Sequence, residues 1–225
     1  MTFYITGAGG FGRETLDALR ATSSAQAADV VFLDEHAQAR EVDGVPVCRP
    51  EQAAVGAFIV AVADPRVRAR LAASLSARGL VPGQVIHPRA VVSPAAALGA
   101  GCVVLANAFL SAGVVLGAHV HVNYNATVGH DTVLGDFVTV LPAANVAGMV
   151  AIGTGVTIGS NACVLQGLRV GSGGTVGAGA VVTRDQPDGA VIAGVPARPL
   201  RRLGPGQGVG GLPGGQPRLS WTAML

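Results

Sequence analysis

Residues 122–164 read VNYNATVGHDTVLGDFVTVLPAANVAGMVAIGTGVTIGSNACV, and an aliphatic residue returns at every sixth position. The same phase extends from Ile86 to Val182, where seventeen consecutive sixth positions all hold Ile, Leu or Val. If about a third of positions were aliphatic by composition, such a run would arise by chance on the order of once in 10⁸ trials. The sixfold period is therefore a structural repeat and indicates the fold.

A period of six fits neither an α-helix nor a hairpin meander. It is typical of a parallel β-helix, in which each hexapeptide makes one short strand and one corner. The aliphatic residue would point inward, and the small or β-branched residue four positions later would fit the turn. Three hexapeptides would close a triangular coil, so residues three hexapeptides apart should stack. We expect the repeat over about residues 86–187, in a domain of residues 86–203.

The composition agrees with a tightly wound, repetitive backbone. Half of the 225 residues are apolar, 33 are Gly and only 4% are aromatic, so small side chains dominate the core. The formal net charge of +2, with Arg and no Lys as the basic residue, gives no sign of nucleic-acid binding. The composition thus excludes a nucleic-acid-binding protein as the first hypothesis.

Cysteine use and hydropathy favour a cytoplasmic protein without membrane insertion. Cys48, Cys102 and Cys163 are far apart and lack metal-ligand spacing, which indicates buried thiols in a reducing compartment. The chain starts directly with a strand-like segment at residues 3–6, without the pattern of a signal peptide. Residues 90–130 are almost uncharged, but Gly, Pro and Asn interrupt them with the wrong period for a membrane helix.

Residues 1–85 predict a small Rossmann-like α/β domain. A glycine-rich turn, Gly7-Ala8-Gly9-Gly10-Phe11-Gly12, stands between a strand and a helix, and an acidic pair, Asp34-Glu35, ends the second strand. The expected strands are residues 3–6, 30–33 and 58–62, and the expected helices are residues 13–20 and 66–78.

This order of elements is the first half of a dinucleotide-binding unit. The glycines let the backbone approach a phosphate at the helix N-terminus, and an acid after the second strand can bind ribose hydroxyls. The glycine motif alone is weak, and a tight turn without a ligand is the alternative. A domain of this small size suits a mononucleotide carrying a sugar better than a full dinucleotide.

The two parts together resemble the sugar O-acyltransferase and sialic-acid O-acetyltransferase family, which includes N-acetyltransferases of nucleotide-linked 4-amino sugars. The resemblance spans nearly all of residues 1–203. It rests on five motifs: GAGGFGRE at 7–14, FLDE at 32–35, IHPRAVVSPAA at 86–96, NYNATVGHD at 123–131 and AGVPARPL at 193–200. It implies a left-handed helix, a homotrimer with the active site between neighbouring helices, and an acetyl-CoA-dependent enzyme of cell-surface glycan biosynthesis.

The resemblance also implies the catalytic residues. His130 would be the general base that takes a proton from the sugar amine or hydroxyl, and Asp131 would orient its imidazole. The chemistry suits a side chain that titrates near neutrality. Gly148 stands three hexapeptides after His130, so the repeat itself predicts that the two stack, and in relatives this Gly contacts the acetyl end of acetyl-CoA.

Further binding residues follow from the same resemblance. The nucleotide-sugar site would comprise Gly9, Gly10, Phe11, Asp34, Glu35 and Ala63, with Asn123 near the base. The acetyl-CoA site would comprise Thr139, Gly148, Ser160, Ala178 and Arg198, with Arg201 and Arg202 also available for phosphates. Some relatives carry His where this chain has Phe11 and Thr139, so the resemblance does not identify the acceptor. An amino group on a nucleotide-linked sugar is the first choice, and a hydroxyl of sialic acid or another sugar is the alternative.

Two other interpretations compete with this one. A zinc site built from His119, His121 and His130 is conceivable on such a helix, but these residues take different places in different coils, so we expect no metal. A non-catalytic scaffold would carry a regular ladder of one polar residue type, which we do not expect the threonines to form. Residues 204–225 are rich in Gly, Pro and Gln and predict a flexible tail.

Overall fold

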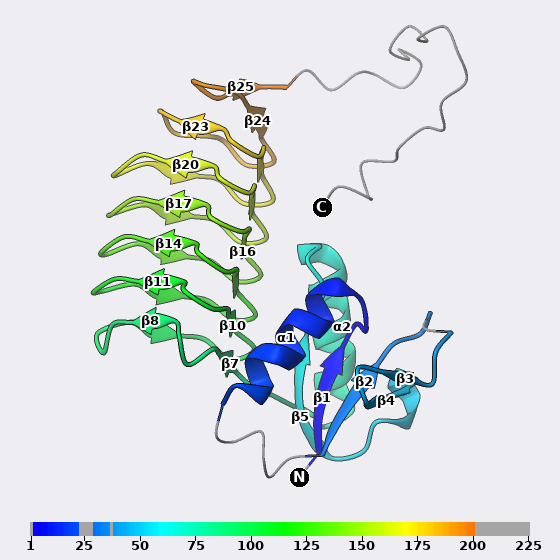
Figure 1. Cartoon of the computed structure of the whole chain (residues 1–225). Coiled ribbons are helices and arrows are strands. Elements are labelled where there is room, and N and C mark those ends of the chain that lie inside the picture. Colours follow the sequence, from blue (N-terminus) through cyan, green and yellow to red (C-terminus); the bar gives the residue numbers. More distant parts are fainter. Residues whose placement is uncertain (1, 23–28, 37, 201–225) are drawn as a thin grey trace, which may run out of the picture.

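The computed structural model describes residues 2–22, 29–36 and 38–200. A small α/β domain lies beside the first coils of a parallel β-helix, and the later coils extend away from it (Figure 1). The segment expected to be a flexible tail, together with Arg201 and Arg202, lies outside the described residues. Within the described ranges, no helix combines the length and apolar character that crossing a membrane requires.

The N-terminal domain contains a six-stranded sheet in the order β3-β4-β2-β1-β5-β6. All neighbours pair in parallel except β3 and β4. The elements are β1 Thr2–Thr6, α1 Gly10–Arg20, β2 Val30–Leu33, β3 Glu41–Val42, β4 Val45–Cys48, the 3₁₀ turn Pro50–Gln52, β5 Gly56–Val60, α2 Pro65–Ala77 and β6 Val81–Pro82. The three expected strands and two helices are present. β3 and β6 are too short to show a periodic pattern, and Pro46 interrupts the apolar run of β4.

The sheet order places a crevice at the carboxyl ends of the central strands. β1 pairs with β2 on one side and with β5 on the other, so the chain reverses its direction of strand addition around β1. In open α/β sheets, ligands bind beyond the carboxyl ends of the strands at this point. The glycine turn after β1, the acidic pair after β2 and residues 62–64 after β5 all lie there.

The β-helix has three faces, each a parallel sheet of very short strands, apart from one antiparallel pair at its end. The first face comprises β7 Val85–Ile86, β10 Val103–Val104, β13 His121–Val122, β16 Thr139–Val140, β19 Thr157–Ile158, β22 Thr175–Val176, β24 Val191–Ala193 and β25 Arg198–Pro199. The second comprises β8 Val91–Val92, β11 Phe109–Leu110, β14 Thr127–Val128, β17 Asn145–Val146, β20 Cys163–Val164 and β23 Val181–Val182. The third comprises β9 Ala97–Leu98, β12 Val115–Leu116, β15 Val133–Leu134, β18 Ala151–Ile152 and β21 Arg169–Val170.

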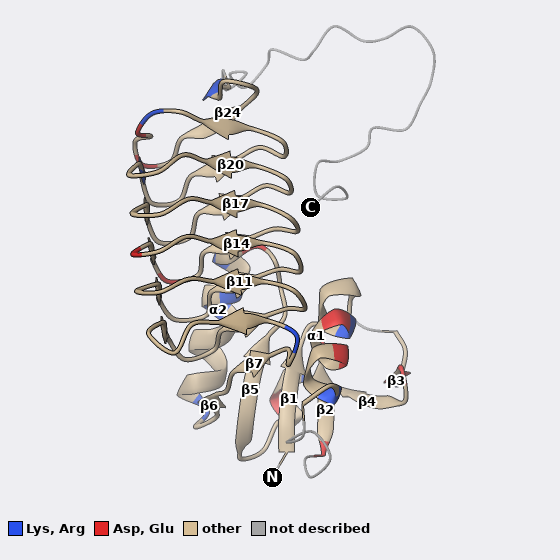
Figure 2. Cartoon of the chain, turned by 60° about the vertical axis from the view of Figure 1, so that its left-hand side comes forward, with Lys and Arg blue, Asp and Glu red and all other residues tan. Residues whose placement is uncertain are grey.

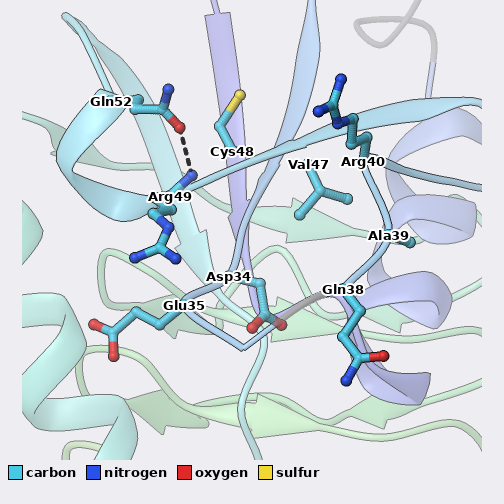
Figure 3. A pocket seen from close by; sticks show the side chains of 9 residues that line it. All are labelled: Asp34, Glu35, Gln38, Ala39, Arg40, Val47, Cys48, Arg49 and Gln52. Atoms are coloured by element: carbon cyan, nitrogen blue, oxygen red, sulfur yellow. Dashed lines mark hydrogen bonds between the residues drawn. The ribbon is translucent and has the colours of Figure 1, made fainter.

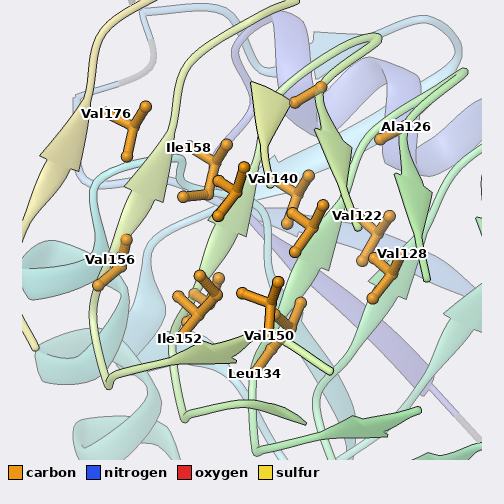
Figure 4. Close-up of a cluster of buried hydrophobic side chains, with 14 of the residues drawn as sticks. Val122, Ala126, Val128, Leu134, Val140, Val150, Ile152, Val156, Ile158 and Val176 are labelled. Carbon is orange, nitrogen blue, oxygen red and sulfur yellow. The ribbon is translucent and has the colours of Figure 1, made fainter. Parts of the chain in front are cut away.

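The core of the β-helix follows the sixfold repeat. In every two-residue strand from β7 to β23, the second residue is the repeat aliphatic. Residues one coil apart pair in register, as Val104, Val122 and Val140 do on the first face. Their side chains are fully buried and meet those of the other two faces inside the coils (Figure 4). Each such burial contributes about 1.5–3 kcal/mol of hydrophobic free energy, so the stack of coils holds itself together.

The corners depend on a residue that the sequence pattern did not reveal. Fourteen consecutive sixth positions from Gly101 to Gly179 have φ between 55° and 77°, in the left-handed region. The sequence pointed to the small residue four positions after each aliphatic, but the left-handed residue is the third. Gly, Asn and Asp adopt this conformation readily. Phe137, Ala143 and Met149 also adopt this conformation, which is less favourable in free energy for a residue with a side chain.

Substituting a non-glycine corner residue by Gly should stabilise the protein. Ala143 is exposed with φ of 58°. Ala143→Gly removes a left-handed cost of about 1–2 kcal/mol against a backbone entropy cost of about 0.5–1 kcal/mol. We expect a higher Tm in thermal unfolding. Ala112→Gly, at an exposed corner position whose φ is not positive, should lower Tm instead; equal shifts in both variants would contradict the prediction.

Candidate active site

His130 and Asp131 project from the corner between β14 and β15. Both are exposed, and Asp131 takes the left-handed position of the corner with φ of 56°. His130 Nδ1 lies 2.9 Å from Asp131 Oδ2. An ionised carboxylate only accepts hydrogen bonds, so in the neutral imidazole that donates to it Nδ1 carries the proton and Nε2 has a free lone pair. The pair is thus arranged to accept a proton at Nε2.

Gly148 keeps the space in front of that nitrogen open. It lies one full coil after His130, and the neighbouring Met149 N donates to His130 O at 2.7 Å. A Cβ atom on Gly148 would lie 2.5 Å from His130 Nε2 and 2.8 Å from its two carbon neighbours. The stacking predicted from the repeat therefore occurs, and a side chain at position 148 would obstruct Nε2 or displace the imidazole.

The glycine turn after β1 contains two kinds of glycine. Gly7 has φ of 101°, and a Cβ on Gly12 would collide with the Gly7 carbonyl, so both are required by the turn itself. Gly9 and Gly10 are exposed, and a Cβ on either would meet no described atom within 4 Å. At the start of α1, where Gly9 is the N-cap, no described side chain caps the free backbone N–H groups. Such an open helix N-terminus is suited to a phosphate.

Asp34 and Glu35 lie beside this turn. Asp34 accepts hydrogen bonds from Ala8 N at 2.9 Å and from His36 N at 2.8 Å, so its carboxylate shapes the glycine turn. Glu35 is exposed. Both line a pocket of about 350 Å³ with Arg40, Arg49 and Gln52 (Figure 3) and a second of about 250 Å³. Ala63 lines a third, of about 400 Å³, between α2 and the first face.

The remaining predicted residues lie away from His130 within one chain. Ser160 and Ala178 stack at the corner between the first and second faces, where Gly179 N donates to Ser160 O at 2.8 Å. Asn123 is buried near that corner and donates to Val140 O at 3.0 Å. Arg198 is exposed on β25. The second face separates these residues from His130, so one chain does not unite them.

Comparison with known proteins identifies the family. Residues 2–75 match the PglD N-terminal domain. Perosamine N-acetyltransferase from Caulobacter crescentus, solved with CoA and GDP-perosamine, is 34% identical over 90% of this chain and 98% of its own, with a TM-score of 0.83. The chain belongs to the hexapeptide-repeat sugar acetyltransferases. No protein of curated function matches its sequence.

Two further solved structures resemble this acetyltransferase. The acetyltransferase domain of PglB from Neisseria gonorrhoeae, in complex with acetyl coenzyme A, is 40% identical over 88% of this chain and 98% of its own, with a TM-score of 0.81. WeeI from Acinetobacter baumannii is 30% identical over 89% and 100%, with a TM-score of 0.84. The predicted fold, a Rossmann-like domain followed by a left-handed parallel β-helix, is confirmed.

The interface between the two domains of the acetyltransferase contains a residue that the sequence did not single out. Arg68 on α2 is fully buried, and burial lowers the pKa of its guanidinium to about 9. It donates to Thr139 Oγ1 at 2.9 Å, and Thr139 donates to Ala63 O at 3.0 Å. Thr139 is only 1% exposed, so its hydroxyl belongs to the interface. Arg68 is one of four arginines between residues 66 and 78, and nothing in the local sequence marks it.

His119 and His121 are core imidazoles of this interface. His121 is fully buried, with its Nδ1 3.1 Å from Arg68 Nη1 and its ring 4.8 Å from that of Phe11. His119 stacks between Phe58 and Phe137, at centroid distances of 6.0 and 5.2 Å. Within the described part of the chain, no three His, Cys, Asp or Glu side chains are grouped to hold a metal ion.

One polar ladder exists, contrary to the expectation for the threonines. Thr139, Thr157 and Thr175 pair in register on the first face. They line the 400 Å³ cleft opposite residues 62–66 of the N-terminal domain. The irregular positions of Thr132 and Thr154 hid this ladder in the sequence. It faces the other domain, so it does not form an open scaffold surface.

The buried histidines should make the enzyme lose stability in weak acid. Burial, followed by the Arg68 charge, lowers the pKa of His121 far below 6.5 and also lowers that of His119. Below pH 6.5 the unfolded chain therefore binds more protons than the folded one. As the pH decreases below 6.5, the free energy of unfolding should fall by about 1.4 kcal/mol for each pH unit because of His121 alone. Denaturant unfolding between pH 7.5 and 5 measures this slope.

His119→Phe provides the matched variant for this prediction. It keeps an aromatic ring between Phe58 and Phe137 but removes one titrating group. The dependence of stability on pH should become shallower between pH 6.5 and 5. A slope equal to that of the parent protein would show that other groups cause the loss.

Proposed function

We propose that the enzyme transfers an acetyl group from acetyl-CoA to the amino group of a nucleotide-linked amino sugar, with His130 as general base. The observation that carries this proposal is the His130–Asp131 pair, whose free Nε2 faces the space kept open by Gly148. The relatives support the substrates, because one is solved with acetyl coenzyme A and another with CoA and GDP-perosamine.

The chemistry follows from this pair. The sugar amine attacks the thioester carbonyl, and His130 Nε2 takes the proton that the amine loses as the C–N bond forms. Asp131 stabilises the resulting imidazolium through Nδ1. When the C–S bond breaks, the imidazolium returns the proton to the leaving thiolate of CoA. A backbone N–H group near the thioester would stabilise the oxyanion between these steps.

The nucleotide would bind at the crevice of the N-terminal domain. The uncapped start of α1 offers N–H groups to a phosphate, and Gly9 and Gly10 leave the room for one to approach. Glu35 is free to accept hydrogen bonds from ribose hydroxyls, while Asp34 shapes the turn. By contrast, Asp64 caps α2 by accepting from Arg66 N and Val67 N, so that helix start is occupied.

The cofactor would extend along the corner that carries Ser160 and Ala178. Ser160 and Ala178 stack along the helix axis, where Gly179 N donates to Ser160 O, and an extended pantetheine would follow this line of backbone. Arg198 is exposed farther along the same axis and could meet the phosphates of CoA. We leave Thr139 out of this site because its hydroxyl is bonded to Arg68 and Ala63.

We further propose a homotrimer, in which the corner of His130 meets the corner of Ser160 and Ala178 from a neighbouring copy. The second and third faces support this, because charged residues are sparse along the coils (Figure 2) and several outward side chains are apolar and exposed. These are Val91, Phe109, Val115, Val133 and Met149. The three cysteines are unpaired, which supports a reducing, cytoplasmic location.

His130→Ala should strongly reduce turnover of the natural acceptor. Loss of a general base lowers kcat by about 10²-fold or more. Thiol release from acetyl-CoA, measured with a panel of UDP-, GDP- and dTDP-linked amino sugars, identifies the acceptor in the parent protein and tests the base in the variant. Gly148→Ala keeps the imidazole but puts a methyl group against Nε2, and it should be similarly impaired.

Each alternative gives a different result in this panel. Turnover that survives His130→Ala would exclude this residue as the base. If the parent protein acetylates no amino sugar but does acetylate sialic acid or another free sugar, the acceptor group is a hydroxyl and not an amino group.

If the active site is shared between neighbouring copies, two inactive variants should restore activity when they are co-expressed. His130→Ala removes the base, and Ala178→Trp should block the cofactor corner, so each variant alone should be inactive. Co-expressed chains should form some sites that combine an intact base with an intact cofactor corner, up to about a quarter of all sites. Recovery of activity only after co-expression is the expected result; none at all would place both elements of a site in one chain.

A further inference from the structure

We propose that Arg68 is a positioning residue for the reaction. It ties the loop that follows β5 to the β-helix, and so holds the nucleotide-sugar domain at a fixed place relative to the catalytic helix. This inference rests on the proposed function, because it concerns how the acceptor sugar is presented.

The contacts of Arg68 divide between the two domains. Nη1 donates to Val62 O at 2.7 Å and to Ala63 O at 3.1 Å, both in the loop after β5. The same nitrogen lies 3.1 Å from His121 Nδ1 on β13. Nη2 donates to Phe137 O at 2.5 Å and to Thr139 Oγ1 at 2.9 Å in the β-helix. One planar guanidinium therefore joins two carbonyl groups of the loop after β5 to three groups of the β-helix.

This junction lies between the elements that flank the nucleotide crevice. Val62 lines both the pocket beside Glu35 and the cleft against the first face. His121, which contacts Arg68, also packs against Phe11 at the start of α1. The loop after β5 and the glycine turn after β1 are thus fixed to the same strand of the β-helix.

Stability alone does not account for a charge at this position. Desolvating a guanidinium is costly, and its Nε has no partner among the described residues. Apolar replacements of buried charged groups are often neutral or stabilising. A guanidinium instead supplies a rigid fork of donors with fixed directions. We infer that this residue fixes the geometry between the domains, which an apolar contact would leave free to slide.

Steady-state kinetics of Arg68→Met test the inference. The KM for the nucleotide sugar should rise about 10-fold or more, because the acceptor is no longer held in place. The KM for acetyl-CoA should stay within about 2-fold. Turnover of the same amino sugar without its nucleotide, at high concentration, should also be unchanged, since that acceptor does not use the N-terminal domain. Arg68→Lys, which cannot reach both domains with a planar fork, should be intermediate.

Arg78→Met is the matched control at the end of the same helix. Arg78 is exposed and donates to Glu51 O at 2.7 Å, away from the interface, so its kinetics should equal those of the parent. If Arg68→Met does not fold, Thr139→Val removes one of the five contacts and should raise the same KM by a smaller factor.

Equal losses on nucleotide-linked and free sugars, or an unchanged KM in a folded Arg68→Met, would overturn the inference. A parent protein without turnover on any nucleotide sugar would instead overturn the proposed function.

Discussion

The inward packing of one aliphatic side chain per hexapeptide is the constraint on which the other features of this enzyme depend. Strands of two residues make too few hydrogen bonds to persist alone, so each coil is held by the coils above and below it. Buried residues such as Val122 and Val140 keep that stack in register. Because the register never slips, a separation of three hexapeptides in sequence becomes direct contact in space. The apposition of His130 and Gly148 is one consequence of this rule.

The residues proposed for catalysis lie at a corner of the β-helix, because the corners are the parts of each coil that project outward. Every corner from Gly101 to Gly179 holds a left-handed residue, and the backbone stays in that conformation whether Gly, Asn or a bulkier residue occupies it. Asp131 takes this position beside His130, where a short carboxylate tolerates the conformation and reaches the imidazole. The proposed catalytic pair therefore uses a backbone geometry that recurs at the described corners from Gly101 to Gly179.

The sequence predicted those parts of the molecule that obey local rules. The sixfold period specified the β-helix and the stacking of Gly148 on His130. The glycine turn predicted a helix after β1, although α1 begins at Gly10, three residues earlier than expected. The left-handed position was missed because residues as different as Gly101, Phe137 and Met149 occupy it. The resemblance suggested a cofactor contact for Thr139, but its hydroxyl is bonded across the domain interface. Contacts between distant segments leave no periodic trace, so Arg68 could not be recognised from its own surroundings.

The inward aliphatic stack of a β-helix is the same in every coil and cannot by itself orient the attached domain, whereas the outward residues of the first face change from Val85 and Val103 to His121. The N-terminal domain must therefore be located by features that break the repeat. Arg68, His121 and Phe11 are such features. Arg68 contacts His121 in one coil and Phe137 and Thr139 in the next, and His121 packs against Phe11. Aliphatic packing inside the coils could not do this, because it would be equally favourable one coil higher or lower. Directional polar contacts to particular coils resolve that ambiguity, and the buried guanidinium of Arg68 supplies them.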